Sequence, residues 1–373
     1  MSSKKLFILI LLVIFSLFVA SCAPAPAEEP AAEEPMEAEE AEAEEAEAEE
    51  AEMEEAEMEA PLELKIALTL NSAVEEPWNL VHINAINQLI EEAAKDGVTV
   101  SYEYTENVWG DDIELAFRQY ADEGFDIIWN AGASPDAIEA VKDEYPDKLF
   151  VMTGSGGKEI GGNGLWIYLH YYEPAYVMGV ISAMVSESGV IGVVGGYPGS
   201  EVNAAIHAYR AGAQSVNPDV QVKITFIESW YDPPKAKEAT LAQLAAGADI
   251  VYGERYGVLE ALNENSVYGF GNYLDENEAY PDIVVTSPLL KAYPITKYTY
   301  DVWYNHATTG EPYDAPAERI WYNWAEGGTD LAPFHGFEDT LPQEVLDKVA
   351  ETIAAIKDGS LEVPLDESQP ESD

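Results

Sequence analysis

Short apolar runs alternate with amphipathic segments along most of this chain, and this alternation is the feature that most limits the folds open to it. The first half predicts strands at 64–70, 98–104, 125–129, 149–153 and 164–169, with helices at 79–94, 111–123 and 135–144 between them. Strands and helices that alternate at this spacing form parallel βαβ units. This half of the chain therefore predicts one doubly wound α/β lobe.

The same pattern then begins again and predicts a second lobe. We expect strands at 190–194, 221–227, 250–252, 267–270 and 283–287, short strands near 319–322, and helices at 173–186, 201–215, 234–246, 292–306 and 343–356. In sheets of this kind, ligands bind beyond the carboxyl ends of the strands. Two such lobes in series predict a hinge and a cleft between them.

The order of the segments also predicts how the chain divides. The first lobe should comprise residues 64–170 together with 288–310, and the second lobe residues 171–287. Residues 311–358 should pack across the lobes, and residues 359–373 form an acidic tail that we expect to be frayed. The hinge should include three crossovers, near 170–173, 271–273 and 286–290.

The first 21 residues are typical of an export signal. Lys4 and Lys5 precede the apolar run Leu6–Phe18, and small residues lead to Cys22, the only cysteine in the chain. Charged, apolar and small segments in this order define a secretory leader. A lone cysteine at the end resembles the lipobox of bacterial lipoproteins, in which the leader is removed and the cysteine is lipidated.

Two other interpretations of this leader remain open. It could be an ordinary secretory signal with an accidental cysteine, or a spanning helix, although the apolar run is shorter than the roughly 20 residues that cross a bilayer. We expect a lipid-anchored protein on the extracytoplasmic side of the cell membrane. Because no cysteine follows Cys22, a disulfide cannot stabilise the exported part.

The segment 22–63 has the composition of a disordered tether. Residues 23–63 contain 19 glutamates and no basic residue, and most of the others are alanine and proline. Self-repulsion and the shortage of large apolar groups prevent a packed core. The residues after 63 still carry 51 acidic and 16 basic side chains, so nucleic acid and anionic lipid head groups are excluded as partners. This acidity indicates a solvated surface or adaptation to a saline habitat.

Sequence signals for catalysis or metal binding are weak. There is no Gly-x-Ser-x-Gly, and the five histidines lack paired metal-ligand spacing. The stretch Gly154–Glu159 lacks the Gly-x-x-x-x-Gly-Lys-Ser/Thr pattern of a phosphate loop. We therefore expect neither an enzyme nor a cofactor.

Aromatic and polar residues gather instead at the expected strand ends. Aromatic rings offer a large apolar area with defined stacking geometry, and neighbouring polar groups would read the edges of a flat, uncharged ring. Taken singly, each aromatic is more often a core residue than a ligand contact. The candidate ligand-binding residues are Trp78, Asn130, Tyr171, Glu173, Tyr197, Glu201, Trp230, Glu254, Asn272 and Tyr273.

Four stretches carry a resemblance to a known family. They are Tyr171–Val180, Gly189–Gly196, Ala211–Asp219 (with Val216-Asn217-Pro218-Asp219) and Ser229–Pro233 (Ser-Trp-Tyr-Asp-Pro). In this order they resemble the basic membrane lipoprotein family, the purine-receptor-like solute-binding proteins of ABC importers. The resemblance implies a type I periplasmic-binding-protein fold that closes on a small ligand and then docks on a permease. We expect a monomer.

The chain departs from that family where a nucleoside's sugar is expected to bind. The family's Gly-Val-Asp-x-Asp-Gln motif corresponds to 271–276 here, so its first aspartate, which resembles a ribose ligand, is Tyr273. Carboxylates bind diols strongly. The loss of this aspartate therefore favours a flatter ligand, such as a purine-like base stacked among Trp78, Tyr171 and Trp230. The alternatives for the ligand are a nucleoside or another small aromatic or sugar-like solute. The alternatives for the function are a receptor that senses without transport and an exported hydrolase.

Overall fold

A computed structural model describes residues 62–154, 156 and 158–373. The predicted signal peptide 1–21, the lipidation residue Cys22 and nearly all of the predicted tether 22–63 lie outside the described residues. The first strand begins at Leu62, so the last two residues of that tether belong to the folded part. None of the described helices is both long enough and apolar enough to span a bilayer.

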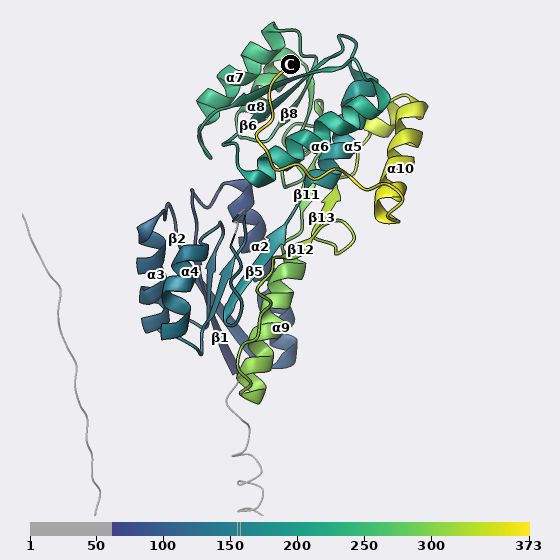
Figure 1. Cartoon of the computed structure of the whole chain (residues 1–373). Coiled ribbons are helices and arrows are strands. Elements are labelled where there is room, and N and C mark those ends of the chain that lie inside the picture. The colour runs from purple at the N-terminus through teal and green to yellow at the C-terminus, as the bar shows by residue number, and fades with distance from the viewer. Residues whose placement is uncertain (1–61, 155, 157) are drawn as a thin grey trace, which may run out of the picture. The chain divides into compact units, whose positions relative to one another are not determined.

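The first lobe is built on a parallel six-stranded sheet in the order β12-β5-β4-β3-β1-β2 (Figure 1). Helices α2 and α9 pack on one face of this sheet, and α3 and α4 pack on the other. Short 3₁₀ turns follow α2 and α4, at Ala94–Asp96 and Lys142–Glu144. The strands are β1 (Leu62–Thr69), β2 (Val98–Thr105), β3 (Ile127–Asn130), β4 (Leu149–Met152), β5 (Gly164–Leu169) and β12 (Ile320–Tyr322), and the helices are α2 (Pro77–Ala93), α3 (Asp111–Asp122), α4 (Pro135–Val141) and α9 (Tyr293–Thr309).

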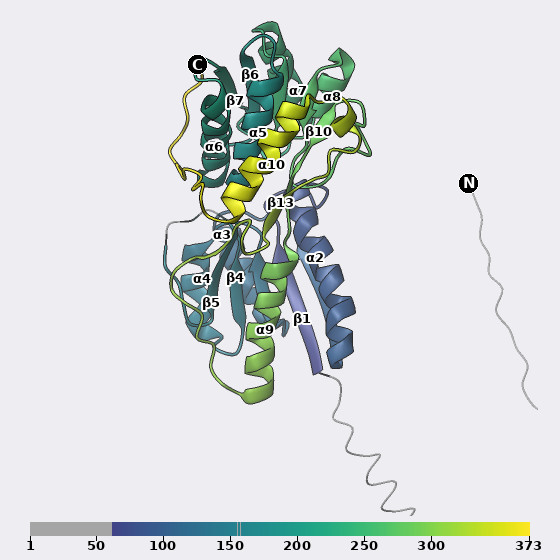
Figure 2. The same ribbon diagram turned by 90° about the vertical axis from the view of Figure 1, so that its right-hand side faces the viewer.

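The second lobe repeats this plan with a parallel five-stranded sheet in the order β10-β9-β8-β6-β7. Helices α5 and α6 pack on one face, and α7 and α8 on the other. Helix α10 packs against α5 (Figure 2). The strands are β6 (Val190–Gly195), β7 (Gln221–Phe226), β8 (Ile250–Gly253), β9 (Tyr268–Phe270) and β10 (Val284–Thr286), and the helices are α5 (Tyr172–Val185), α6 (Ser200–Val216), α7 (Pro233–Ala245), α8 (Val258–Asn265) and α10 (Gln343–Lys357).

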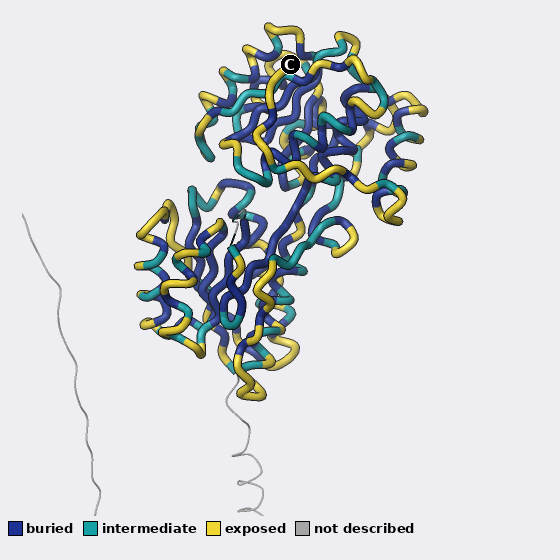
Figure 3. The backbone as a smooth tube through the Cα atoms, in the orientation of Figure 1, coloured by how far each residue is buried: buried dark blue, intermediate teal, exposed yellow. Residues whose placement is uncertain are grey.

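Apolar residues on both faces of the central strands explain why helices cover both sides. In β1, Ile66 and Leu68 face the α2 side, and Ala67 faces the α3 side. In β6, Val193 and Val194 divide in the same way between the two faces of the second sheet. Parallel strands are buried on both faces because crossover helices cover each side. Figure 3 shows the buried strands at the centre of each lobe.

Three segments connect the lobes, and one of them differs from the expected position. The chain crosses at His170 and Tyr171, again between β10 and α9, and finally between β12 and α10. The last two crossings contain β11 (Pro288–Leu290) and β13 (Thr329–Leu331), which pair antiparallel. The crossover predicted near 271–273 is wrong, because β9 and β10 belong to the same sheet and the chain between them returns to its own lobe.

The segment 254–265 contains a helix that the sequence pattern did not predict. Helix α8 is eight residues long and follows Gly257, which ends the preceding loop with a φ of 99°. It buries Val258, Leu259 and Leu262 against the second sheet. Two turns are too short for a clear helical period, so the apolar spacing was not visible in the sequence.

The residues after Asp358 are bound to the second lobe rather than frayed. Asp373 exchanges two hydrogen bonds with Val222 of the edge strand β7, at 2.8 and 3.2 Å. Asn203 of α6 donates to the main-chain oxygen of Glu367, and Val363 is buried. Acidic composition predicted a solvated tail, but the open edge of a sheet offers unpaired main-chain groups that such a segment satisfies.

Helices α5 and α6 approach so closely that their contact requires glycine. A Cβ atom on Gly179 would lie 1.9 Å from the main-chain oxygen of Tyr209, and one on Gly212 would lie 1.9 Å from that of Tyr176. Heavy atoms cannot approach to that distance. The glycines therefore set the distance between α5 and α6, the two helices that cover one face of the second sheet.

Replacing Gly212 with alanine should therefore destabilise the protein. We expect Gly212→Ala to lower the free energy of unfolding by about 2–3 kcal/mol, because the added methyl group overpacks the helix contact. Urea unfolding followed by circular dichroism measures this change. Ala211→Ser, one residue away and only partly buried, is the control and should change it by less than about 1 kcal/mol. Equal stability of the two variants would contradict the close approach.

Candidate functional site

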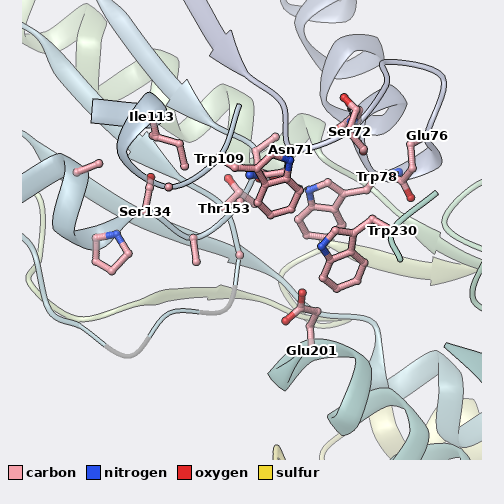
Figure 4. Close-up of a pocket in the computed structure, with 18 of the residues that line it drawn as sticks. Asn71, Ser72, Glu76, Trp78, Trp109, Ile113, Ser134, Thr153, Glu201 and Trp230 are labelled. Carbon is pink, nitrogen blue, oxygen red and sulfur yellow. Dashed lines mark hydrogen bonds between the residues drawn. The ribbon is translucent and has the colours of Figure 1, made fainter. Parts of the chain in front are cut away.

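Loops at the carboxyl ends of both sheets surround one cavity of about 490 Å³. The first lobe contributes the loops that follow β1, β2, β3 and β4, and the second contributes loops after β7, β8 and β9 with the start of α6. Figure 4 shows the lining side chains converging on the cavity. Among the lining residues are Asn71, Ser72, Glu76, Trp78, Trp109, Gly132, Ser134, Thr153, Glu201, Trp230, Arg255 and Tyr273.

The indole of Trp78 is held at the first-lobe wall of the cavity. Trp78 is the second residue of α2, which begins at Pro77 behind an N-cap carboxylate from Glu76. Its Nε1 donates to the main-chain oxygen of Ala131 at 2.8 Å. Its ring meets the ring of Tyr273 edge-on, with centroids 5.8 Å apart. Two loops and a helix start thus fix the orientation of this indole.

Trp230 forms the second-lobe wall. Arg255 lies against its ring, with Cζ 5.2 Å from the centroid, and donates from Nη1 to the Trp230 main-chain oxygen at 2.9 Å. The ring of Tyr197 packs edge-on against the Trp230 ring, with centroids 5.1 Å apart. A Cβ atom on Gly196 would lie 2.8 Å from the indole. Gly196, directly after β6, therefore makes room for Trp230.

A buried ionic cluster joins the two lobes beside this wall. The guanidinium of Arg255 donates to both carboxylate oxygens of Glu254, and it donates to Glu76 of the first lobe at 3.2 Å. Glu254 also accepts from the Gly196 main-chain nitrogen at 3.0 Å and from the Tyr273 hydroxyl at 2.8 Å. All three charged side chains are at most 5% exposed. The partners around each charged group offset the cost of burying it.

Burial changes the acidity of groups in and around this cluster. It raises the pKa of Glu76 to about 7, although the nearby Arg255 acts in the opposite direction. It also raises the pKa of the Tyr171 and Tyr273 hydroxyls well above the ordinary value. Beneath Trp78, burial lowers the pKa of His82 to about 3, so that this ring is neutral. Burial of charge is the main cause in each case.

The first-lobe end of the cavity presents hydrogen-bonding groups. The Nδ2 of Asn71 donates to the main-chain oxygen of Val108, and its Oδ1 faces Gly132, where a Cβ atom would lie 2.0 Å away. Ser134 is the N-cap of α4, yet its buried hydroxyl has no hydrogen-bond partner. The Thr153 hydroxyl accepts from Trp129 at 2.8 Å. Both hydroxyl groups keep unused hydrogen-bonding capacity.

The structure brings four of the ten candidate residues to the cavity surface: Trp78, Glu201, Trp230 and Tyr273. The other six support it or lie elsewhere. Asn130, Tyr171, Glu254 and Asn272 are buried behind the lining and bond to other protein groups. Tyr197 backs Trp230, and Glu173 accepts from the Trp324 main-chain nitrogen.

Several lining residues were not among the candidates. Trp109, Asp111, Ser134 and Thr153 line the first-lobe side. Ser134 and Thr153 follow β3 and β4 closely, so their positions at strand ends could have indicated them. Trp109 follows β2 at the same spacing as Ser134 follows β3, so its position could also have indicated it. Among the described residues, no group of three or more His, Cys, Asp or Glu side chains could hold a metal ion.

Two α/β lobes that enclose a cavity at the carboxyl ends of their strands define the class of two-lobed solute-binding proteins. The chain matches the Bmp family, described as ABC transporter substrate-binding protein PnrA-like, over residues 64–355. It belongs to that family, whose members bind solutes outside the cytoplasm for ABC transporters. The predicted family and the predicted type I periplasmic-binding-protein fold are both confirmed.

Similar proteins agree with this assignment. A purine-binding protein of Brucella abortus is 29% identical over 288 residues, which cover 76% of this chain and 78% of that protein. A putative ABC transporter glucose-binding protein of Haloferax volcanii is 35% identical over 198 residues, 50% of this chain and 48% of its own. An ABC transporter solute-binding protein from Aeropyrum pernix superposes with a TM-score of 0.67 at 16% identity, covering 81% of this chain and 94% of that one.

The buried Glu76 should make stability depend on pH near neutrality. With its pKa raised from 4.5 to about 7, the folded protein keeps a proton that the unfolded chain has already released. Stability is therefore lost as pH rises from 4.5 through 7, by up to about 3 kcal/mol. We expect Glu76→Gln to remove this part of the pH dependence, measured as the free energy of unfolding from pH 5 to 8.

The neighbouring exposed carboxylate provides the control for this experiment. Glu75→Gln should keep the wild-type pH dependence, because Glu75 lies at the surface outside the ionic cluster. If Glu76→Gln and the wild type lost stability in parallel, Glu76 would not be the titrating group.

Proposed function

We propose that this protein binds a purine-like nucleobase or nucleoside between its lobes and delivers it to the permease of an ABC importer. The observation that carries this proposal is the pair of indoles, Trp78 from one lobe and Trp230 from the other, that face one cavity. Flat rings stack well on indoles. The volume of about 490 Å³ lies in the range of small-molecule sites. The relative named as a purine-binding protein supports the same ligand class.

Binding would proceed by closure of one lobe on the other. The first lobe comprises 64–170 with 288–310, the second 171–287, and the segment 311–358 joins them. The hinge lies in the crossings at His170–Tyr171, around β11 and around β13. A ligand in contact with both Trp78 and Trp230 stabilises the closed form, because only that form contacts it from both sides.

A sugar-like solute is the second candidate. The hydroxyl groups of Ser134 and Thr153 and the Oδ1 of Asn71 gather at one end of the cavity, and such groups bind sugar hydroxyls. The relative named as a putative glucose-binding protein supports this alternative. A sugar would bind at that end and leave the indoles to cover its apolar face.

A binding panel separates the candidates. We expect isothermal calorimetry with the purified protein to show binding of purine bases or nucleosides and none of glucose. Trp78→Ala and Trp230→Ala should each weaken binding by roughly 10- to 100-fold, because each removes one stacking face. Tyr268→Ala alters an exposed aromatic of the second lobe outside the cavity lining, so its affinity should equal that of the wild type.

Two results would contradict the proposal. Binding of glucose without any purine would favour the second candidate. Purine binding that survives both tryptophan substitutions would show that the ligand lies elsewhere in the protein.

We also propose that Cys22 carries a lipid anchor and that the acidic segment after it tethers the folded part to the membrane. The order of charged, apolar and small residues before Cys22 supports this proposal. A tether of roughly 40 residues holds a receptor near its permease at high local concentration.

Removing the cysteine tests the anchor directly. Cys22→Ser should abolish incorporation of a radiolabelled fatty acid and shift the protein from the membrane fraction to the soluble fraction. Ligand affinity of the folded part should stay the same, since anchor and cavity are separate in sequence. Ser21→Thr, beside the cysteine, is the control and should remain lipidated. Unchanged labelling of Cys22→Ser would refute the anchor.

A further inference from the structure

Glu201 stands out among the lining residues because it brings an acceptor to the stacking surface. It lies in the first turn of α6, on the second lobe. Figure 4 shows its side chain rising from α6 toward the indole of Trp230. The N-terminal end of a helix favours an anionic side chain. A carboxylate is therefore placed where the edge of a stacked ring would lie.

The lining offers no available positive charge to balance an anionic ligand. Among the described residues of the lining, Arg255 is the only lysine or arginine. Four of its hydrogen bonds go to Glu254, Glu76 and the Trp230 main-chain oxygen. Further carboxylates line the cavity at Asp111, Glu114 and Asp136. A phosphate or carboxylate in this cavity would meet like charge without a free cation.

Several N–H donors of the lining are engaged with the protein. The Nε1 of Trp78 is bound to Ala131, and the Nδ2 of Asn71 is bound to Val108. The side chain of Asn79 donates to the main chain and hydroxyl of the loop 72–73. The Glu201 carboxylate, in contrast, is offered to a ligand as an acceptor, and an acceptor requires a donor on the ligand.

From these observations, and resting on the proposed function, we propose that Glu201 reads the ring edge and selects purines that present two adjacent N–H donors. Guanine has such an edge, with N1–H beside the N2 amino group. Adenine has the N1 acceptor beside its amino group, so a carboxylate there accepts one hydrogen bond and faces a lone pair. Two parallel hydrogen bonds to a carboxylate form the stronger pairing.

The same arrangement predicts that phosphorylated purines are excluded. The cavity thus discriminates between ligands in two ways, by the hydrogen-bond pattern of the ring and by the net charge of the ligand. Neither selection requires a change in the stacking surface, since Trp78 and Trp230 contact the faces of any purine. Glu201 is therefore a specificity residue, whereas the indoles supply affinity.

The test compares guanine and guanosine with adenine and adenosine, and guanosine with guanosine monophosphate, by calorimetry on the whole purified protein. We expect the wild type to prefer the guanine compounds by about 10- to 100-fold and to bind the monophosphate at least about 10-fold more weakly than guanosine. Glu201→Gln replaces one carboxylate oxygen with an amide donor of the same shape. The preference should then fall to within about 3-fold.

Two further variants separate ring reading from a structural effect. The charge of Glu201 acts on the buried Tyr168 hydroxyl of the first lobe and adds to the rise in the pKa of Tyr168 that burial causes. Tyr168→Phe removes that contact and should keep the guanine preference. Glu260→Gln changes a first-turn glutamate of α8 outside the cavity, and it should leave every affinity unchanged.

The outcomes distinguish this inference from the proposed function. Absence of binding to all bases and nucleosides would refute the proposed function, and the inference with it. Purine binding with equal or greater affinity for adenine compounds would refute the inference alone. So would a guanine preference that persists in Glu201→Gln, or one that Tyr168→Phe removes.

Discussion

The ionic cluster of Glu76, Arg255 and Glu254 is the interaction on which the arrangement of the site depends. A buried guanidinium is tolerated only with carboxylates around it, and here the carboxylates come from both lobes. The same guanidinium holds Trp230 through its ring and its main-chain oxygen, and Glu254 holds the Tyr273 hydroxyl. Trp230, Tyr273 and the contact between the lobes therefore share one set of charges. The contact between the lobes and the positions of Trp230 and Tyr273 are coupled for that reason.

The two lobes contribute different chemistry to the cavity. The first lobe supplies hydroxyl and amide groups from loops that follow β1, β3 and β4, and the second supplies Trp230 and the Glu201 carboxylate. Glycines make this convergence possible, since side chains at Gly132 and Gly196 would collide with Asn71 and Trp230. A ligand that contacts both ends joins the lobes, which is how a two-lobed receptor converts binding into a change of shape.

Much of the fold was predictable because apolar periodicity and strand–helix alternation are local. The order of most strands and helices followed from them. Helix α8 was missed because two turns carry little periodic signal, and the three-residue strands β11 and β13 were missed as well. The candidate site was predicted less well. Trp78, Glu201, Trp230 and Tyr273 line the cavity, but Asn130, Tyr171, Glu254 and Asn272 lie behind it. Position at a strand end does not determine whether a side chain faces the cavity or the core, since neighbouring residues point to opposite sides.

The sequence by itself determined the class of fold and the family, because local patterning and short motifs such as Ser229–Pro233 specify them. The tertiary structure decided which lobe crossings exist, that the last residues bind the edge of β7, and that Arg255 joins both lobes. These features depend on contacts between residues far apart in the chain. Glu76 and Arg255 are 179 residues apart, and nothing in the local pattern around either residue indicates the other.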